Sequence, residues 1–182
     1  AALCKKKNIG LVLSVGPRAT YDMGGFVKSV NGVRIGYRIR GMEQVVYAVE
    51  DVKRAIGLGV RGIMVYDEGL LWILKELRDK HIIPKDTVFK FSVHCGYANP
   101  ASIQFIESAG ANIVNPVPDL DLPMVAAVRK AVRCPLSIFT DTAGEAGNFV
   151  RTYDVPEFVR IASPVFLKCG SSSQVKQAHL PS

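Results

Sequence analysis

The feature that most constrains the fold of this chain is an alternation of short apolar runs with helical patterns from Gly62 onward. The runs begin at residues 63, 88, 113, 136 and 165, so successive runs start 23 to 29 residues apart. One strand, one helix and their connections fill such a period, and this βαβα order predicts a sheet of parallel strands. No Gly-x-Gly-x-x-Gly turn follows any run, which argues against a dinucleotide-binding sheet and favours a barrel.

Residues that commonly begin and end helices separate the apolar runs. Asn99-Pro100 supplies an N-cap and a first-turn proline, and Gly110 is a typical helix end. Asp121 and Asp154 each precede another helical pattern. Apolar residues at helical spacing then predict the segments themselves. Helices are expected over residues 43–56, 70–80, 101–109, 122–132 and 156–162.

Two segments upstream of this rhythm also predict strands. Residues 33–40 alternate strictly, with aliphatic residues on one face and arginines on the other, and residues 11–15 form a short apolar run. The resulting count of about seven strands falls short of the eight units, spanning ~200 residues or more, of a complete barrel. The chain also begins with Ala-Ala rather than Met. We therefore expect an α/β fold in which residues 1–169 form one parallel (β/α) barrel-type domain, an incomplete TIM-like barrel lacking its first units, followed by a polar C-terminal tail over 170–182.

Composition narrows the class of protein further. Hydrophobic residues make up 48% of the 182, enough to bury a core, whereas the apolar run over 9–15 is about a third of a membrane-spanning helix. Four scattered cysteines without a Cys-x-x-Cys pair predict reduced thiols. We therefore expect a cytoplasmic protein with no membrane partner. The net charge of +7 suits an anionic small molecule or peptide, and it leaves nucleic acid open as a partner.

A segment over residues 57–77 resembles the collagenase-like peptidases, the unassigned-peptidase family numbered thirty-two. Members carry a similar pattern, Gly-x-x-(Gly/Ala)-(Ile/Val)-x-Val-x-Asp-x-Gly-Leu-Leu, and the resemblance continues in order over 91–103, 108–116 and 149–168. It extends from Val33 to Lys168 and carries scaffold glycines and turns more than a catalytic signature. What it implies is a TIM-barrel-type catalytic region in a family named for peptidase activity.

Relatives of that family hydroxylate RNA or quinone without oxygen, using an iron–sulfur cluster bound by cysteines. This chain shows no counterpart of that cysteine set. Cys134 precedes its strand, at the end of the barrel opposite Cys95 and Cys169, so the thiols should not converge. We therefore expect no iron–sulfur cluster.

The active site of a (β/α) barrel is built at the C-terminal ends of its strands, and here those ends carry polar residues. Strand alternation places Lys90, Ser92 and His94 on the inner face, and Phe89 and Phe91 on the face that meets helices. The same alternation turns inward Ser137 and Asp141 of one strand, Lys168 of another, and Arg34 and Arg38 upstream. We expect catalytic roles for His94, Asp141 and Lys168, and substrate-binding roles for Arg34, Arg38, Asp67 and Asn115. Of these, Arg38, His94, Asp141 and Lys168 should surround one cavity.

Each of these residues also has a purely structural interpretation. Asp67 could cap the helix that follows it, and Asn115 could shape a turn before Pro116. The arginines could form ion pairs with Asp67 or Asp141. Cys95 is a weaker candidate nucleophile, because a residue next to His94 on a strand points to the opposite face.

Three functions fit this set of residues. The first is a hydrolase of the collagenase-like peptidase type, in which His94 and Asp141 act as acid–base groups or hold a divalent metal and the arginines hold a carboxylate. No zincin or serine-hydrolase motif is present, so this expectation rests first on the resemblance. The second is a lyase or aldolase forming a Schiff base on Lys168. The third is a non-catalytic partial barrel that binds an anion or RNA and pairs its open strand edges by homo-oligomerisation.

Overall fold

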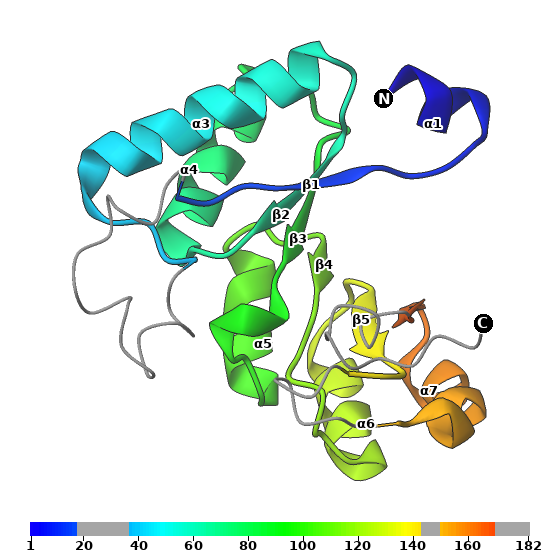
Figure 1. The fold of residues 1–182 in the computed structure, drawn as a ribbon. Helices are drawn as coiled ribbons and strands as arrows, with labels where there is room; N and C mark the ends of the chain where they lie inside the picture. Colours follow the sequence, from blue (N-terminus) through cyan, green and yellow to red (C-terminus); the bar gives the residue numbers. More distant parts are fainter. Residues whose placement is uncertain (18–36, 143–149, 170–182) are drawn as a thin grey trace.

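The computed structural model describes residues 1–17, 37–142 and 150–169. Six parallel strands form one sheet in the order in which they occur along the chain, so β1 and β6 are its two edges. The sheet curls into half of a barrel (Figure 1). Its strands are β1 (Val12–Ser14), β2 (Gly62–Val65), β3 (Val88–Phe91), β4 (Ile113–Val114), β5 (Leu136–Phe139) and β6 (Val165–Lys168).

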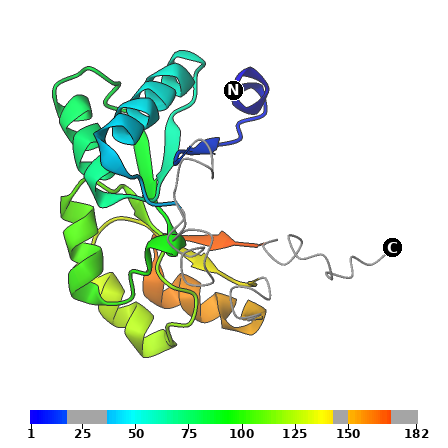
Figure 2. The ribbon, with the colours of Figure 1, turned by 60° about the vertical axis from the view of Figure 1, so that its left-hand side comes forward.

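The helices that follow the first strand connect the strands and lie on one side of the curled sheet, whereas the short N-terminal helix lies apart from them (Figure 2). Three of them begin where the sequence predicts, because a side chain accepts a hydrogen bond from a free backbone N–H of the first turn: Asp67, Asn99 and Asp121. The α-helices are α1 (Ala2–Lys6), α3 (Gly41–Gly57), α4 (Glu68–Asp79), α5 (Pro100–Ser108), α6 (Leu122–Ala131) and α7 (Val155–Ala162), and short 3₁₀ turns occur at η3 (Val93–Cys95) and η5 (Thr152–Asp154).

The hydrophobic core lies between the sheet and these helices. Phe89 and Phe91 of β3 are completely buried, as are Leu71 and Leu74 of α4 and Phe158 of α7. Successive residues of a strand face opposite sides of the sheet. Lys90, between Phe89 and Phe91, therefore faces the concave side of the half-barrel. The incomplete parallel α/β barrel predicted from the sequence is confirmed as a half-barrel, in which alternation separates a helix-covered face from a concave one.

The predicted strand over 33–40 is wrong where the structure describes it. Residues 33–36 lie outside the described ranges, and residues 37–40 form a turn and an extended segment that leads into α3. Tyr37 stacks on another aromatic ring, and Arg38 forms an ion pair with Glu68. Within the described residues the sheet therefore has six strands where about seven were expected.

Strand β1 packs tightly on the start of β2. A Cβ atom added to Gly62 would lie 2.7 Å from the carbonyl oxygen of Leu11 and 2.9 Å from a methyl carbon of Val12. Only glycine allows the two backbones to approach this closely. The edge strand β1 therefore depends on this residue for its position.

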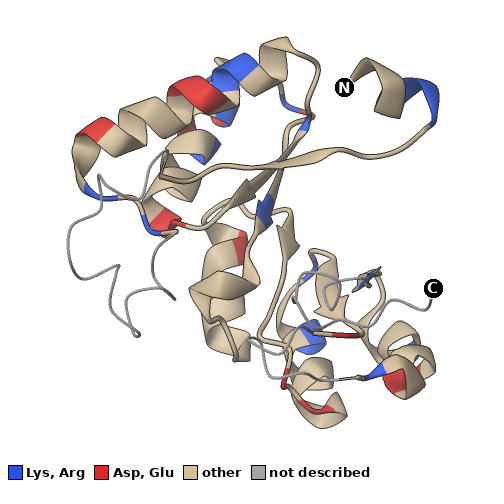
Figure 3. Ribbon diagram, in the orientation of Figure 1, with Lys and Arg blue, Asp and Glu red and all other residues tan. Residues whose placement is uncertain are grey.

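Charged residues are interspersed over the described chain. Along α3 the acidic side chains lie in the first and middle turns and the basic ones lie toward its C-terminal end (Figure 3). Among the described residues, no helix is both long and apolar enough to cross a membrane.

Candidate functional site on the concave face

A lysine and a serine connect two strands across the concave face. The Nζ atom of Lys90, in β3, donates a hydrogen bond to Oγ of Ser137, in β5, at 2.9 Å. The bond passes over β4, the strand between them. Ser137 is completely buried and Lys90 half-buried. Burial lowers the pKa of Lys90, and the charge of Lys168 lowers it further.

Lys168, the last residue of β6, faces the same concave space. Its ammonium group lies 4.0 Å from the centre of the Phe139 ring, a cation–π contact with the neighbouring strand. Burial lowers the pKa of Lys168. Neither Lys90 nor Lys168 forms an ion pair with a carboxylate of the described residues. The concave face therefore holds two half-buried cations that repel each other. Lys90 contacts the Ser137 hydroxyl and Lys168 contacts the Phe139 ring.

His94 lies in the η3 turn that follows β3, close enough to Lys168 to be affected by its charge. The hydroxyl of Ser92 accepts a hydrogen bond from the backbone N–H of His94 and begins this turn. The imidazole ring of His94 stacks on the Tyr37 ring with centroids 4.8 Å apart, and the Tyr37 ring stacks on the Tyr66 ring at the same distance. Burial lowers the pKa of His94, and so does the charge of Lys168. The imidazole is therefore neutral at pH 7, with a ring nitrogen able to accept a proton.

Arg38 is committed to a neighbouring cluster. It forms its ion pair with Glu68, in the first turn of α4, and the hydroxyl of Tyr97 donates to the other oxygen of that carboxylate at 2.6 Å. The sequence suggested Asp67 or Asp141 as the structural partner of this arginine, and the structure gives Glu68 instead. Arg34, the second predicted arginine, lies outside the described residues.

Asp67 acts as the N-cap of α4. Its Oδ1 accepts a hydrogen bond from the backbone N–H of Leu70 at 3.0 Å, and its backbone is extended, as is usual for this position. This is the structural interpretation that the sequence offered for Asp67. Asp141 follows β5, where its backbone bridges Val150, and it is half-buried.

Asn115 follows β4 and is only 1% exposed. Neither the nitrogen nor the oxygen of its carboxamide has a hydrogen-bond partner within the described chain. Buried amides are nearly always bonded, so this residue departs from the usual pattern.

The cysteines are four separate thiols. Burial raises the pKa of Cys95 to about 11 and that of Cys134 to about 12, so both are protonated at neutral pH and are poor nucleophiles. Cys169 is exposed, and its Sγ accepts a hydrogen bond from the hydroxyl of Thr140 at 3.2 Å. In the described ranges, no three His, Cys, Asp or Glu side chains gather in a metal-binding group.

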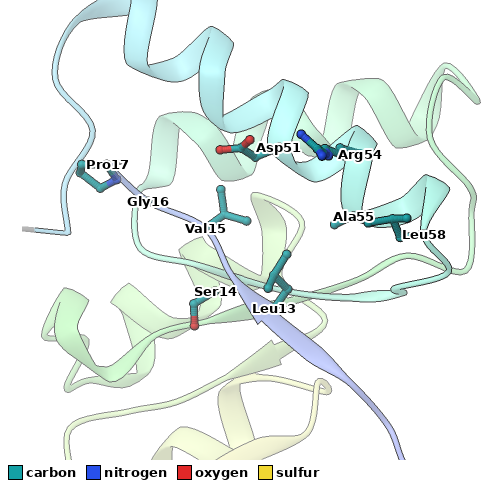
Figure 4. Close-up of a pocket in the computed structure, with 9 residues that line it drawn as sticks. All are labelled: Leu13, Ser14, Val15, Gly16, Pro17, Asp51, Arg54, Ala55 and Leu58. Carbon is teal, nitrogen blue, oxygen red and sulfur yellow. The ribbon is translucent and has the colours of Figure 1, made fainter. Parts of the chain in front are cut away.

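A pocket of about 430 Å³ lies elsewhere, between β1 and the second half of α3 (Figure 4). Leu13 and Val15 line it from the strand, and Asp51, Arg54 and Leu58 line it from the helix. None of the residues predicted for the site lines this pocket. It is therefore distinct from the concave-face cluster.

The structure thus gathers part of the predicted set. His94 and Lys168 lie within each other's electrostatic influence on the concave face, while Arg38 and Asp67 are engaged around the start of α4. Lys90 joins the cluster, although strand alternation predicts only that it faces inward. A lysine between two phenylalanines in an otherwise apolar strand is the signal that could have identified it.

These features define a (β/α) half-barrel with a cationic, histidine-bearing concave face. No protein-family profile and no curated protein matches the sequence. Among solved structures, the chain is similar to one described as the U32 peptidase Mk0906, with 15% sequence identity and a TM-score of 0.52 over 99% of this chain. The chain spans 62% of the length of that structure. At this identity the similarity shows a shared fold.

Proposed function

We propose that the protein is a hydrolase of the collagenase-like peptidase type, acting on a peptide that carries an anionic group, with its active site on the concave face. The observation that carries the proposal is a pair of half-buried lysines, without a carboxylate partner among the described residues, beside a neutral histidine. The fold similarity to a U32 peptidase supports it.

The lysines are suited to hold the anionic group. A partly buried ammonium group loses hydration, and an opposite charge offsets that loss. Lys90 and Lys168 each raise the cost of charging the other, which a bound carboxylate would reverse. Arg38 is less available for this role because Glu68 already neutralises it.

His94 is suited to act as the general base. Its neutral imidazole would take a proton from a water molecule as the water oxygen bonds to the peptide carbonyl carbon. Lys168 carries an ammonium proton on the same face, which it would give to the leaving amine when the C–N bond breaks. Asp141, at the end of the strand that pairs with β6, is proposed as the carboxylate that assists these transfers.

The test is cleavage of short peptides by the purified chain. We expect peptides with a free C-terminal carboxylate to be cleaved, with products identified by mass spectrometry, and His94→Gln to lower kcat about 100-fold or more. Lys168→Met should lower both binding and turnover. Lys85→Met serves as the matched control: Lys85 is exposed and belongs to the connection before β3, so the substitution should leave activity unchanged.

Two outcomes would contradict the proposal. If the wild-type protein releases no product from any peptide, it is not a peptidase. If His94→Gln keeps full activity, His94 is not the general base. Melting temperatures of all variants are measured alongside, so that a loss of activity is separated from a loss of folded protein.

A further inference from the structure

The carboxamide of Asn115 is buried without hydrogen bonds to the described chain. It is 1% exposed, yet both its Nδ2 donor and its Oδ1 acceptor are without a hydrogen-bond partner among the described residues. A buried amide gives up its hydrogen bonds to water, and leaving both ends unmade is costly. An amide held in this state is suited to a ligand that supplies one donor and one acceptor together.

Strand register places this amide on the concave face. The backbone N–H of Asn115 donates to the carbonyl of Phe91 at 3.0 Å, which extends the pairing of β4 with β3 by one residue. Val114, the residue before it, is buried among the core residues. Because successive residues face opposite sides, Asn115 faces the concave side with Lys90 and Ser137.

The two serines beside Asn115 tie it to the proposed site. The register puts Ser92 next to it on the β3 side and Ser137 on the β5 side. The Ser92 hydroxyl accepts from the backbone of His94, and the Ser137 hydroxyl accepts from Lys90. The amide therefore lies between the two groups that would position the base and the cation.

We infer that Asn115 binds the main chain of one extended peptide residue, through Nδ2 to its C=O and Oδ1 from its N–H. In an extended residue these two groups project to the same side, as they do along a β-strand, and so match the two ends of a carboxamide. The inference rests on the proposed function and deepens it. The substrate class becomes a short peptide bound in extended form, its carboxylate at Lys90 and Lys168 and the preceding residue at Asn115.

The test compares two ligands that differ in one N–H. Acetyl-alanyl-alanine carries the peptide N–H that Oδ1 would accept, and O-acetyl-lactyl-alanine has an ester oxygen in its place. Calorimetry on wild-type protein should give about tenfold weaker binding for the ester, the ratio expected when a buried acceptor loses its partner. Asn115→Leu, similar in size and without polar atoms, should bind the two ligands equally.

The outcomes separate this inference from the proposed function. Binding with the predicted N–H preference but without cleavage would refute the hydrolase and leave the role of Asn115 standing. Cleavage with equal affinity of wild-type protein for both ligands would overturn the role of Asn115 and leave the hydrolase. Failure of acetyl-alanyl-alanine to bind wild-type protein would also overturn the inference. Should Asn115→Leu fail to fold, the comparison on wild-type protein still decides.

Discussion

Substitution of Asp67 tests whether this residue caps a helix or binds a ligand. Asp67→Ala removes the 3.0 Å hydrogen bond to the backbone of Leu70 and a negative charge at the start of α4. Loss of an N-cap costs about 1 kcal/mol, and loss of the charge at the helix dipole about 0.5 kcal/mol. For a chain of this length, each kcal/mol lowers the melting temperature by about 2–4 °C, so the expected fall is about 3–6 °C.

The assay is thermal unfolding followed by circular dichroism, together with binding of acetyl-alanyl-alanine. Asp67→Asn keeps an oxygen acceptor and should recover most of the loss, while Asp119→Ala, an exposed carboxylate in a turn, should change the melting temperature little. Both Asp67 variants should bind the ligand as wild type does. A fall of less than 1 °C in Asp67→Ala, or tenfold weaker binding by Asp67→Asn, would refute the assignment of Asp67 as a helix cap.

Three further predictions follow from particular contacts. Gly62→Ala should destabilise the fold by about 1–3 kcal/mol in urea unfolding, because the added methyl group meets the backbone next to and within β1. Gly57→Ala, which has open space around it, should not destabilise the fold. Equal effects of the two substitutions would contradict the packing of β1. Cys95, with its pKa raised to about 11, should react with iodoacetamide at pH 8 far more slowly in the folded protein than after denaturation, as peptide mapping would show. Lys168→Met should raise the pKa of His94 followed by NMR, because the neighbouring positive charge is gone, and an unchanged pKa would show that the two groups do not interact.

The lowered pKa of His94 also sets the sign of a pH effect on stability. Between the folded pKa and the unfolded value of about 6.5, the unfolded chain binds more protons, so stability rises with pH across that window. His94→Gln should flatten this slope in urea titrations from pH 5 to pH 7. A slope unchanged by the substitution would show that His94 titrates alike in the folded and unfolded chains.

The periodic part of the fold could be predicted from sequence because its signals are local. Apolar runs and caps such as Asn99 and Asp121 act within a few residues, so strands and helices fell where the patterns placed them. The segment ending at Arg40 was mispredicted because its alternation imitates a strand, whereas Arg38 and Tyr37 have partners 29 residues or more away. Contacts between residues so far apart in the chain cannot be predicted from the spacing of neighbouring residues.

The site was predictable only as far as strand alternation reaches. Alternation correctly placed Lys90 and Ser137 on the concave face, but their hydrogen bond spans 47 residues and one intervening strand. The same limit applies to Asp67, whose capping role and ligand-binding role have the same sequence signature. The unpartnered state of Asn115 depends on everything packed around it and has no signature in the sequence.

A crystal structure of the protein with acetyl-alanyl-alanine bound tests the central claim most directly. We expect the carboxylate of the ligand at about 3 Å from the ammonium groups of Lys90 and Lys168, and its main chain on the carboxamide of Asn115. Density for the ligand only in the pocket between β1 and α3, with the two lysines bonded instead to carboxylates of the chain itself, would contradict a binding site on the concave face.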